Sequence, residues 1–414
     1  MLEKMKSAWR IPELRKKIIY TFGMLLVYRL LCVIPVPGID IGTVAAAVKD
    51  YSILDFMNMM TGGSFQNMSI MAMGITPYIN SSIILQLLTV AVPSLEKLAK
   101  EGPEGRKKIT EWTRYLTVVL AFIQAVGLVF AMRANSYGGI WYVVIGISMA
   151  AGTALAMWIG ERITENGIGN GISLLIMAGV VSNMFNWARQ AIVGVAAGTV
   201  GIVPVLVVVI ALLAMIVVIT FVDMGERRIP VQYAKRMVGR KMYGGQSTHI
   251  PMKINSTGVM PLIFGFAILQ FPATVFAFFP TSGINLWWQG FQSGVWYQVV
   301  LAVLIIAFTY FYTGITFNPA DISKNMQQNG GIIPGIRQGR ATTDYLARVS
   351  SRLTLFSALF LAVLATIPTI ITRLFGVSTP FAASSVLIAV SVGIETIRQV
   401  EAQMVMRHHK GFLG

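Results

Sequence analysis

The segment from Val200 to Val222 reads VGIVPVLVVVIALLAMIVVITFV and carries no charged side chain. A helix rises about 1.5 Å per residue, so about 20 apolar residues cross a hydrocarbon layer of roughly 30 Å. Charged residues make up only 12% of the 414 residues, about half the share usual in soluble domains. The segment therefore predicts a transmembrane helix in a membrane protein.

Nine further apolar stretches have a similar length. With the first they predict an all-α polytopic membrane protein of ten transmembrane helices. The ten predicted spans are Ile18–Val36, Ser69–Val92, Tyr115–Met132, Ile140–Ile159, Ile172–Trp187, Val200–Val222, Ser256–Phe279, Tyr297–Phe317, Leu353–Thr372 and Val377–Ile397.

The basic residues are distributed unequally between the two sides of these spans. With the N-terminus in the cytoplasm, 28 of the 33 Lys and Arg lie in cytoplasmic segments, and Arg29 lies inside the first span. Basic residues are retained on the cytoplasmic side of a membrane, so both termini are expected to be cytoplasmic. The net charge of +16 then belongs to one face, where it favours anionic lipids or an acidic partner such as ribosomal RNA.

Ten spans with a cytoplasmic N-terminus imply two five-helix halves that run in opposite senses, as in an inverted repeat. The expected units are a cytoplasmic amphipathic N-terminus (1–17), a first half (18–187), an external hinge (188–199), a second half (200–397) and a cytoplasmic tail (398–414). The cytoplasmic loops 93–114, 223–253 and 318–352 are too long to be plain connectors, and long ordered loops tend to be functional.

An apolar stretch in the first external loop is too short to span a membrane. It extends from Ser52 to Met60, where Ser52 is the expected helix cap and Gly62-Gly63 the expected stop. Apolar surface of this kind is not left in water, so the stretch is expected to lie on the membrane or to fold back into the protein.

The sequence gives little support to catalysis. The three histidines have no nucleophile or carboxylate partner nearby, no Walker-type phosphate loop is present, and Cys32 is the only cysteine. No enzyme activity and no cofactor or metal is therefore expected.

Ion-coupled transport is the serious alternative, because such transporters also use inverted repeats. They place ionisable residues at the middle of the membrane, and here the span interiors are nearly free of charge. Arg29 is close enough to the end of the first span for its guanidinium to snorkel outward. A pathway without fixed charge favours a substrate of variable chemistry over an ion.

Six segments together resemble the signature segments of the bacterial SecY family, in the right order along the chain. They are residues 35–40 (PVPGID), 74–82 (GITPYINSS), 161–173 (ERITENGIGNGIS), 246–255 (QSTHIPMKIN), 317–319 (FNP) and 331–337 (GIIPGIR). The resemblance implies the general secretory protein-conducting channel of the plasma membrane, which passes signal sequences and unfolded polypeptides. It also implies the partners SecE, SecG, the SecA motor and the ribosome, and a clamshell of two halves around a central pore.

The resemblance further implies roles for individual residues. A plug matches the short external stretch (Ser52, Ile53, Leu54, Asp55, Phe56, Met57, Asn58, Met59 and Met60, in a plug segment 52–66), and the aliphatic pore ring matches Ile79, Ile83, Ile176, Val180, Ile263 and Ile388. Such a ring would block ions by dewetting and yet let an extended peptide pass. A lateral gate for apolar segments is implied between the second and third spans and the seventh and eighth, latched by Thr89, Gln124 and Asn255.

Docking of a motor or ribosome is implied for the cytoplasmic loops. Arg337 follows Pro334-Gly335, a pair that favours a tight turn and would present one guanidinium at a loop tip. Basic residues interleaved with tyrosines in the loop 223–253 add a possible surface for phosphates or acidic proteins: Arg227, Arg228, Arg236, Arg240 and Lys241.

Overall fold

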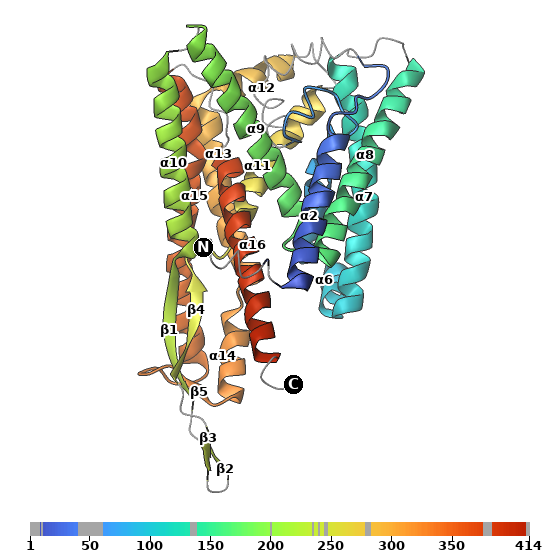
Figure 1. The fold of residues 1–414 in the computed structure, drawn as a ribbon. Helices are drawn as coiled ribbons and strands as arrows, with labels where there is room; N and C mark the ends of the chain where they lie inside the picture. The colour runs from blue at the N-terminus through green and yellow to red at the C-terminus, as the bar shows by residue number, and fades with distance from the viewer. Residues whose placement is uncertain are drawn as a thin grey trace.

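The computed structural model describes residues 9, 11–39, 61–132, 139–198, 201–233, 236–238, 241–243, 247–277, 283–375 and 383–410. Helices dominate these residues (Figure 1). The helices are α2 (Pro12–Leu31), α5 (Thr76–Ala91), α6 (Pro93–Lys100), α7 (Pro103–Met132), α8 (Gly139–Asn166), α9 (Gly171–Ala196), α10 (Ile202–Met224), α11 (Met260–Ala277), α12 (Gly283–Ser293), α13 (Val295–Thr316), α14 (Pro319–Gln328), α15 (Arg340–Phe375) and α16 (Ala383–Lys410).

Each predicted span overlaps one long helix of the described chain. Six of these helices, α7, α8, α9, α10, α13 and α15, are long and apolar enough to cross a membrane by length and composition. The bent pair α5 and α6 makes a seventh if it counts as one span, and α11 has a shorter apolar part, Met260–Leu269. The predicted membrane-spanning helical fold is present, and ten spans remains the predicted number.

Several predicted boundaries are wrong. The second span was expected to begin at Ser69, but α5 begins at Thr76, because Gly74 has a φ of +53° and Pro77 occupies the first turn of the helix. The fifth span was expected to be the shortest, yet α9 continues to Ala196, so most of the expected hinge 188–199 is helical. The helices α2 and α16 likewise include residues assigned to the N-terminal segment and to the tail.

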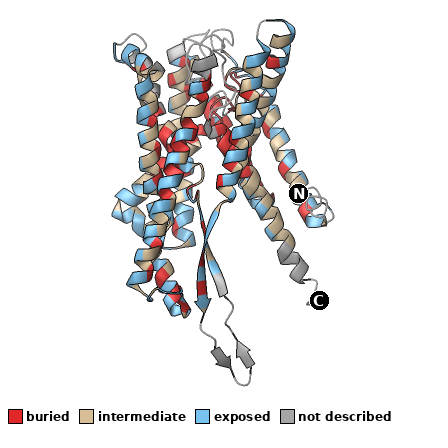
Figure 2. Cartoon of the chain, turned by 90° about the vertical axis from the view of Figure 1, so that its left-hand side faces the viewer, coloured by how far each residue is buried: buried red, intermediate tan, exposed pale blue. Residues whose placement is uncertain are grey.

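Two of the long loops, 223–253 and 318–352, contain strands within the predicted helical fold. The loop 223–253 forms a long hairpin of β1 (Glu226–Tyr233) and β4 (Ser247–Lys253), tipped by β2 (Arg236–Val238) and β3 (Lys241–Tyr243). The short β5 (Gly331–Ile332) pairs with β1 and completes a three-stranded sheet in the order β4-β1-β5. The tip of this hairpin extends beyond the helices (Figure 1), and Figure 2 shows both exposed and buried residues along its long strands.

The loop 93–114 is largely helical. Val92 has the β conformation that a following proline imposes, and Pro93 begins α6. The axis of α6 is bent by 102° from that of α5. None of the residues of α6 is buried, so this helix lies on the outside of the described protein.

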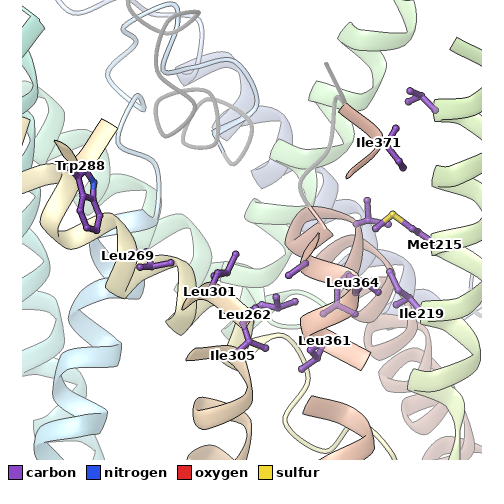
Figure 3. Packing of buried hydrophobic residues seen from close by; sticks show 14 residues of the cluster. Met215, Ile219, Leu262, Leu269, Trp288, Leu301, Ile305, Leu361, Leu364 and Ile371 are labelled. Atoms are coloured by element: carbon purple, nitrogen blue, oxygen red, sulfur yellow. The ribbon is translucent and has the colours of Figure 1, made fainter. Parts of the chain in front are cut away.

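The helices form two groups (Figure 1). In the first, α7 contacts α5 and α8, and α8 contacts α2 and α9. In the second, α13 contacts α11 and α15, and α10 contacts α16. Each group has its own apolar core; Figure 3 shows that of the second group, where Ile219 of α10, Leu262 of α11, Ile305 of α13 and Leu361 of α15 are buried together. These groups correspond to the predicted halves.

The two halves meet along two seams. At one seam α9 packs against α16, and at the other α7 contacts α11. Each seam thus joins one helix of the first half to one helix of the second.

Candidate functional site: the junction of the two halves

An apolar cluster fills the junction between the halves. It is built around Ile176 and Val180 of α9 and Ile388 of α16, which are all buried, and Ile79 of α5 and Ile263 of α11 pack against it. The side chains at all five positions are aliphatic. The junction therefore offers no hydrogen-bonding side chain at these positions, and water or an ion that entered it would lose solvation.

Five of the six residues expected in a pore ring belong to this one cluster, although they come from four helices and both halves. The sixth, Ile83, is also buried, at 5% exposure, but it lies one helical turn beyond Ile79 and outside the cluster. The structure therefore separates a central group of five from one flanking residue.

The expected plug residues Ser52 to Met60 lie outside the described residues. The segment that follows them is described, and it is packed into the first half: Thr61, Ser64 and Phe65 are each at most 2% exposed. Gly62 and Gly63 have φ values of +68° and +87°, the left-handed conformation expected where a helix stops. The downstream end of the expected plug segment is thus fixed inside the protein.

The predicted latch residues do not form one hydrogen-bonded group. The Thr89 hydroxyl donates to the carbonyl oxygen of Leu85 in its own helix, at 2.7 Å. Among the described residues, no hydrogen bond joins Thr89 or Gln124 to Asn255. The role of these three side chains as a latch stays a prediction. The position of the gate, at the seam between α7 and α11, stays a prediction.

Asn255 belongs instead to a polar cluster inside the second half. Its Nδ2 donates to Asp223 Oδ1 at 2.9 Å, and its Oδ1 accepts a hydrogen bond from Ser357 of α15 at 3.1 Å. Ser391 of α16 donates to the other carboxylate oxygen of Asp223. Asp223 lies at the end of α10, so the cluster joins three helices to the segment before α11. The sequence analysis missed Asp223, because a single acidic residue at the end of a span has no distinctive pattern.

The hairpin presents part of the expected docking surface. Arg227 and Arg228 are exposed on β1, while the side chains of Arg236, Arg240 and Lys241 lie outside the described residues. Arg228 donates to Glu226 at 2.7 Å, and this hydrogen bond holds the pKa of the Glu226 carboxyl below its usual range. Among the described residues Arg227 and Arg337 form no ion pair, so both guanidiniums are available to an acidic partner.

Arg337 lies directly after a tight turn, as predicted. The backbone N–H of Ile336 donates to the carbonyl oxygen of Ile333 at 3.0 Å, and Gly335, the third residue of this turn, has a φ of +82°. Proline second and glycine third are typical of a type II turn. The hydroxyl of Thr342 donates to the carbonyl oxygen of Arg337 at 2.8 Å and fixes the backbone after the turn. The Arg337 side chain is exposed.

Two of the signature segments have a structural explanation. Asn170 caps α9: its Oδ1 accepts hydrogen bonds from the backbone N–H groups of Ile172 and Ser173. Asn318 caps α14 in the same way, with Pro319 in the first turn. The first cap orients the helix that carries Ile176 and Val180. Asparagine before a helix was the signal that would have predicted both caps.

Comparison with known proteins decides the family. The SecY family profile matches residues 69–397, which is most of the chain. This chain belongs to the SecY family. Similar SecY members include the protein translocase subunit SecY of Streptomyces galbus, 42% identical over 442 residues, and that of Aquifex aeolicus, 40% identical over 427 residues. Each comparison covers 100% of both chains.

Solved structures share the SecY fold. One described as a protein conducting channel matches with a TM-score of 0.71 at 20% identity and covers 94% of this chain and 93% of that chain. A second, from work on the plug domain of a SecY protein, matches with a TM-score of 0.70 at 20% identity and covers 94% and 92%. The SecY arrangement of helices is therefore present here, although four in five residues differ.

Proposed function

We propose that this chain is the pore-forming subunit of a protein translocase in the plasma membrane, and that it passes unfolded polypeptides across the membrane. Its SecY relatives are named protein translocase subunits. The single observation that carries the proposal is the apolar cluster at the junction of the halves, where Ile79, Ile176, Val180, Ile263 and Ile388 meet. The role is that of a channel and not of an enzyme.

The five aliphatic side chains are proposed to act as the pore ring. In the closed state they pack together and exclude water, so ions do not cross. When the halves separate, the ring makes no specific hydrogen bond, so it accepts a peptide of any sequence. Apolar segments are proposed to leave sideways at the seam between α7 and α11, because Leu or Ile favours lipid while Asp or Lys costs about 2.5–3.5 kcal/mol at its centre.

The proposed partners lie beside this pore in the membrane and on its cytoplasmic side. SecE and SecG are proposed as membrane subunits, and the SecA motor and the ribosome as sources of the driving force. Arg337 and Arg227, exposed and free of ion pairs among the described residues, would meet acidic groups of a motor or phosphates of ribosomal RNA. A solved channel from the canine endoplasmic reticulum in a ribosome complex has the same fold, with a TM-score of 0.67 and 19% identity, and supports this expectation.

The test is reconstitution. The chain, copurified with its membrane subunits, is placed in lipid vesicles with a purified motor, ATP and an unfolded secretory precursor. Protection of the precursor from added protease, dependent on ATP, is the expected result. A tight vesicle that couples an ion gradient to uptake of a small solute, with no precursor protected, would favour the secondary transporter instead.

A further inference from the structure

Arg29 is a charged residue inside the first predicted span, and the groups that its guanidinium contacts indicate its role. Ionisable residues within membrane helices are costly and usually functional. Arg29 was expected to snorkel outward, and this expectation is wrong. Its guanidinium points into the protein, where Nη1 lies 3.4 Å from the carbonyl oxygen of Gly62 and Nη2 donates to the carbonyl oxygen of Ala178.

These two carbonyl groups belong to two different parts of the proposed channel. Ala178 lies on α9 between Ile176 and Val180, two residues of the central cluster. Gly62 lies directly after the expected plug helix, at the point where the described chain resumes. Arg29 itself is on α2, where its Cζ is 5.9 Å from the ring centroid of the buried Tyr28. One side chain thus joins α2, the pore-lining helix and the end of the plug segment.

The backbone at Gly62 is shaped for this contact. A Cβ atom at this position would lie 2.5 Å from both Nη1 and Nη2 of Arg29, closer than such atoms approach. Its φ of +68° also disfavours other residues. A side chain at this position would therefore displace the guanidinium and would strain its own backbone.

The segment that follows Gly62 in the chain is held by backbone hydrogen bonds. The backbone N–H of Val36 donates to the carbonyl oxygen of Met68 at 2.9 Å, and that of Ile70 to the carbonyl oxygen of Ile34 at 2.9 Å. The chain after the plug segment is therefore bound to the chain before it. Gly62 thus lies just before this bound segment and in contact with Arg29.

We propose that Arg29 is a positioning residue that fastens the downstream end of the plug segment to α9 when the channel is closed. The inference rests on the proposed function. The planar guanidinium suits this task because Nη1 and Nη2 are separate nitrogens and each reaches one carbonyl group, whereas the ammonium group of lysine donates from a single nitrogen. Opening that separates α2 from α9 breaks the contact and frees the plug segment at the same moment.

The test compares Arg29→Met, Arg29→Lys and Gly62→Ala in the purified complex. Loss of a charge-assisted hydrogen bond corresponds to about tenfold in an equilibrium constant, so Arg29→Met and Gly62→Ala are each expected to raise resting ion conductance in planar bilayers about tenfold. Arg29→Lys is expected to be intermediate. Because both changes break one contact, the double variant should conduct no more than either single variant.

Two matched controls exclude general damage. Arg189→Met removes an exposed arginine from the outer end of α9, and Gly198→Ala changes a glycine with a φ of +72° that has open space around it. Both are expected to stay tight. Thermal unfolding of each purified complex is measured beside the conductance, and the two site variants are expected to keep the wild-type midpoint to within a few degrees.

The outcomes separate this inference from the proposed function. Tight Arg29→Met and Gly62→Ala channels, in a preparation whose wild type translocates a precursor, would overturn the role of Arg29 alone. Additive leaks in the double variant, or a leak that appears only with loss of the folded complex, would also overturn it. A wild-type complex that translocates nothing would overturn the proposed function instead.

Discussion

The side-chain amide of Asn255 donates a hydrogen bond to the carboxylate of Asp223, with 2.9 Å between Nδ2 and Oδ1. Asn255 is 5% exposed, so neither water nor a residue of the first half takes the place of Asp223 as its hydrogen-bond partner. With Ser357 and Ser391, the pair holds the ends of α10 and α11 to α15 and α16. The second half is therefore braced internally at the level where its hairpin begins.

Breaking this brace is expected to weaken the second half. Asp223→Ala leaves the Asn255 amide and the Ser391 hydroxyl without their acceptor, a loss of about 1–3 kcal/mol. The thermal unfolding midpoint of the purified complex should fall. Asn255→Ala should also lower the midpoint, and the double variant should lose less stability than the two single losses combined.

The control is Asp321→Ala, which removes an exposed hydrogen bond with Asn318 and should cost only about 0.5 kcal/mol of stability. Equal midpoints for Asp223→Ala and Asp321→Ala would contradict the brace.

The apolar cluster predicts which isoleucines seal the pore. Ile176→Asn, Ile263→Asn and Ile388→Asn place an amide in the central cluster, so water should persist in the closed channel and resting conductance should rise at least about tenfold. Ile83→Asn, outside the cluster, should leak less. Ile192→Asn is the control, because Ile192 lies on α9 and is 71% exposed. Planar-bilayer recording decides: silent channels in all three cluster variants would mean that the pore lies elsewhere.

Arg337 is predicted to couple the channel to its motor. Arg337→Glu replaces an exposed cation after a rigid turn with a charge that repels an acidic partner, and ATP-driven translocation should slow at least about tenfold. Assembly and ion tightness should be unchanged, since the side chain is exposed and forms no ion pair among the described residues. Arg340→Glu, an exposed neighbour at the start of α15, should have a much smaller effect. The rate of precursor protection is measured for both, and equal rates would remove Arg337 from this role.

The charge bias predicts the orientation in the membrane. In a Cys32→Ser background, single cysteines at Ser94 of α6 and Gln328 of α14 should react with an impermeant thiol reagent only from the cytoplasmic side. A cysteine at Gln190, near the outer end of α9, should react from outside intact cells. All three positions are exposed, so lack of access does not confuse the result. Labelling of Ser94 or Gln328 variants from outside would reverse the topology.

The sequence by itself determined the helices, their rough number and the sign of the charge on one face. Long apolar segments have one low-energy state in a bilayer, the helix, because every backbone polar group must find a partner within the segment. Local rules also predicted the turn at Pro334-Gly335 and the stop at Gly62-Gly63. These features depend on residues within a few positions of one another, and therefore the sequence shows them directly.

The tertiary structure decided which distant residues meet. Ile176 and Ile388 are about two hundred residues apart, and only the packing of α9 against α16 brings them together. The fold likewise decided that the partner of Asn255 is Asp223 and not Thr89. It also decided that the guanidinium of Arg29 turns inward, because the carbonyl groups of Gly62 and Ala178 are within its reach. An unpaired charge or amide in an apolar protein is bound by whichever partner the fold places nearest, and no local pattern specifies that partner.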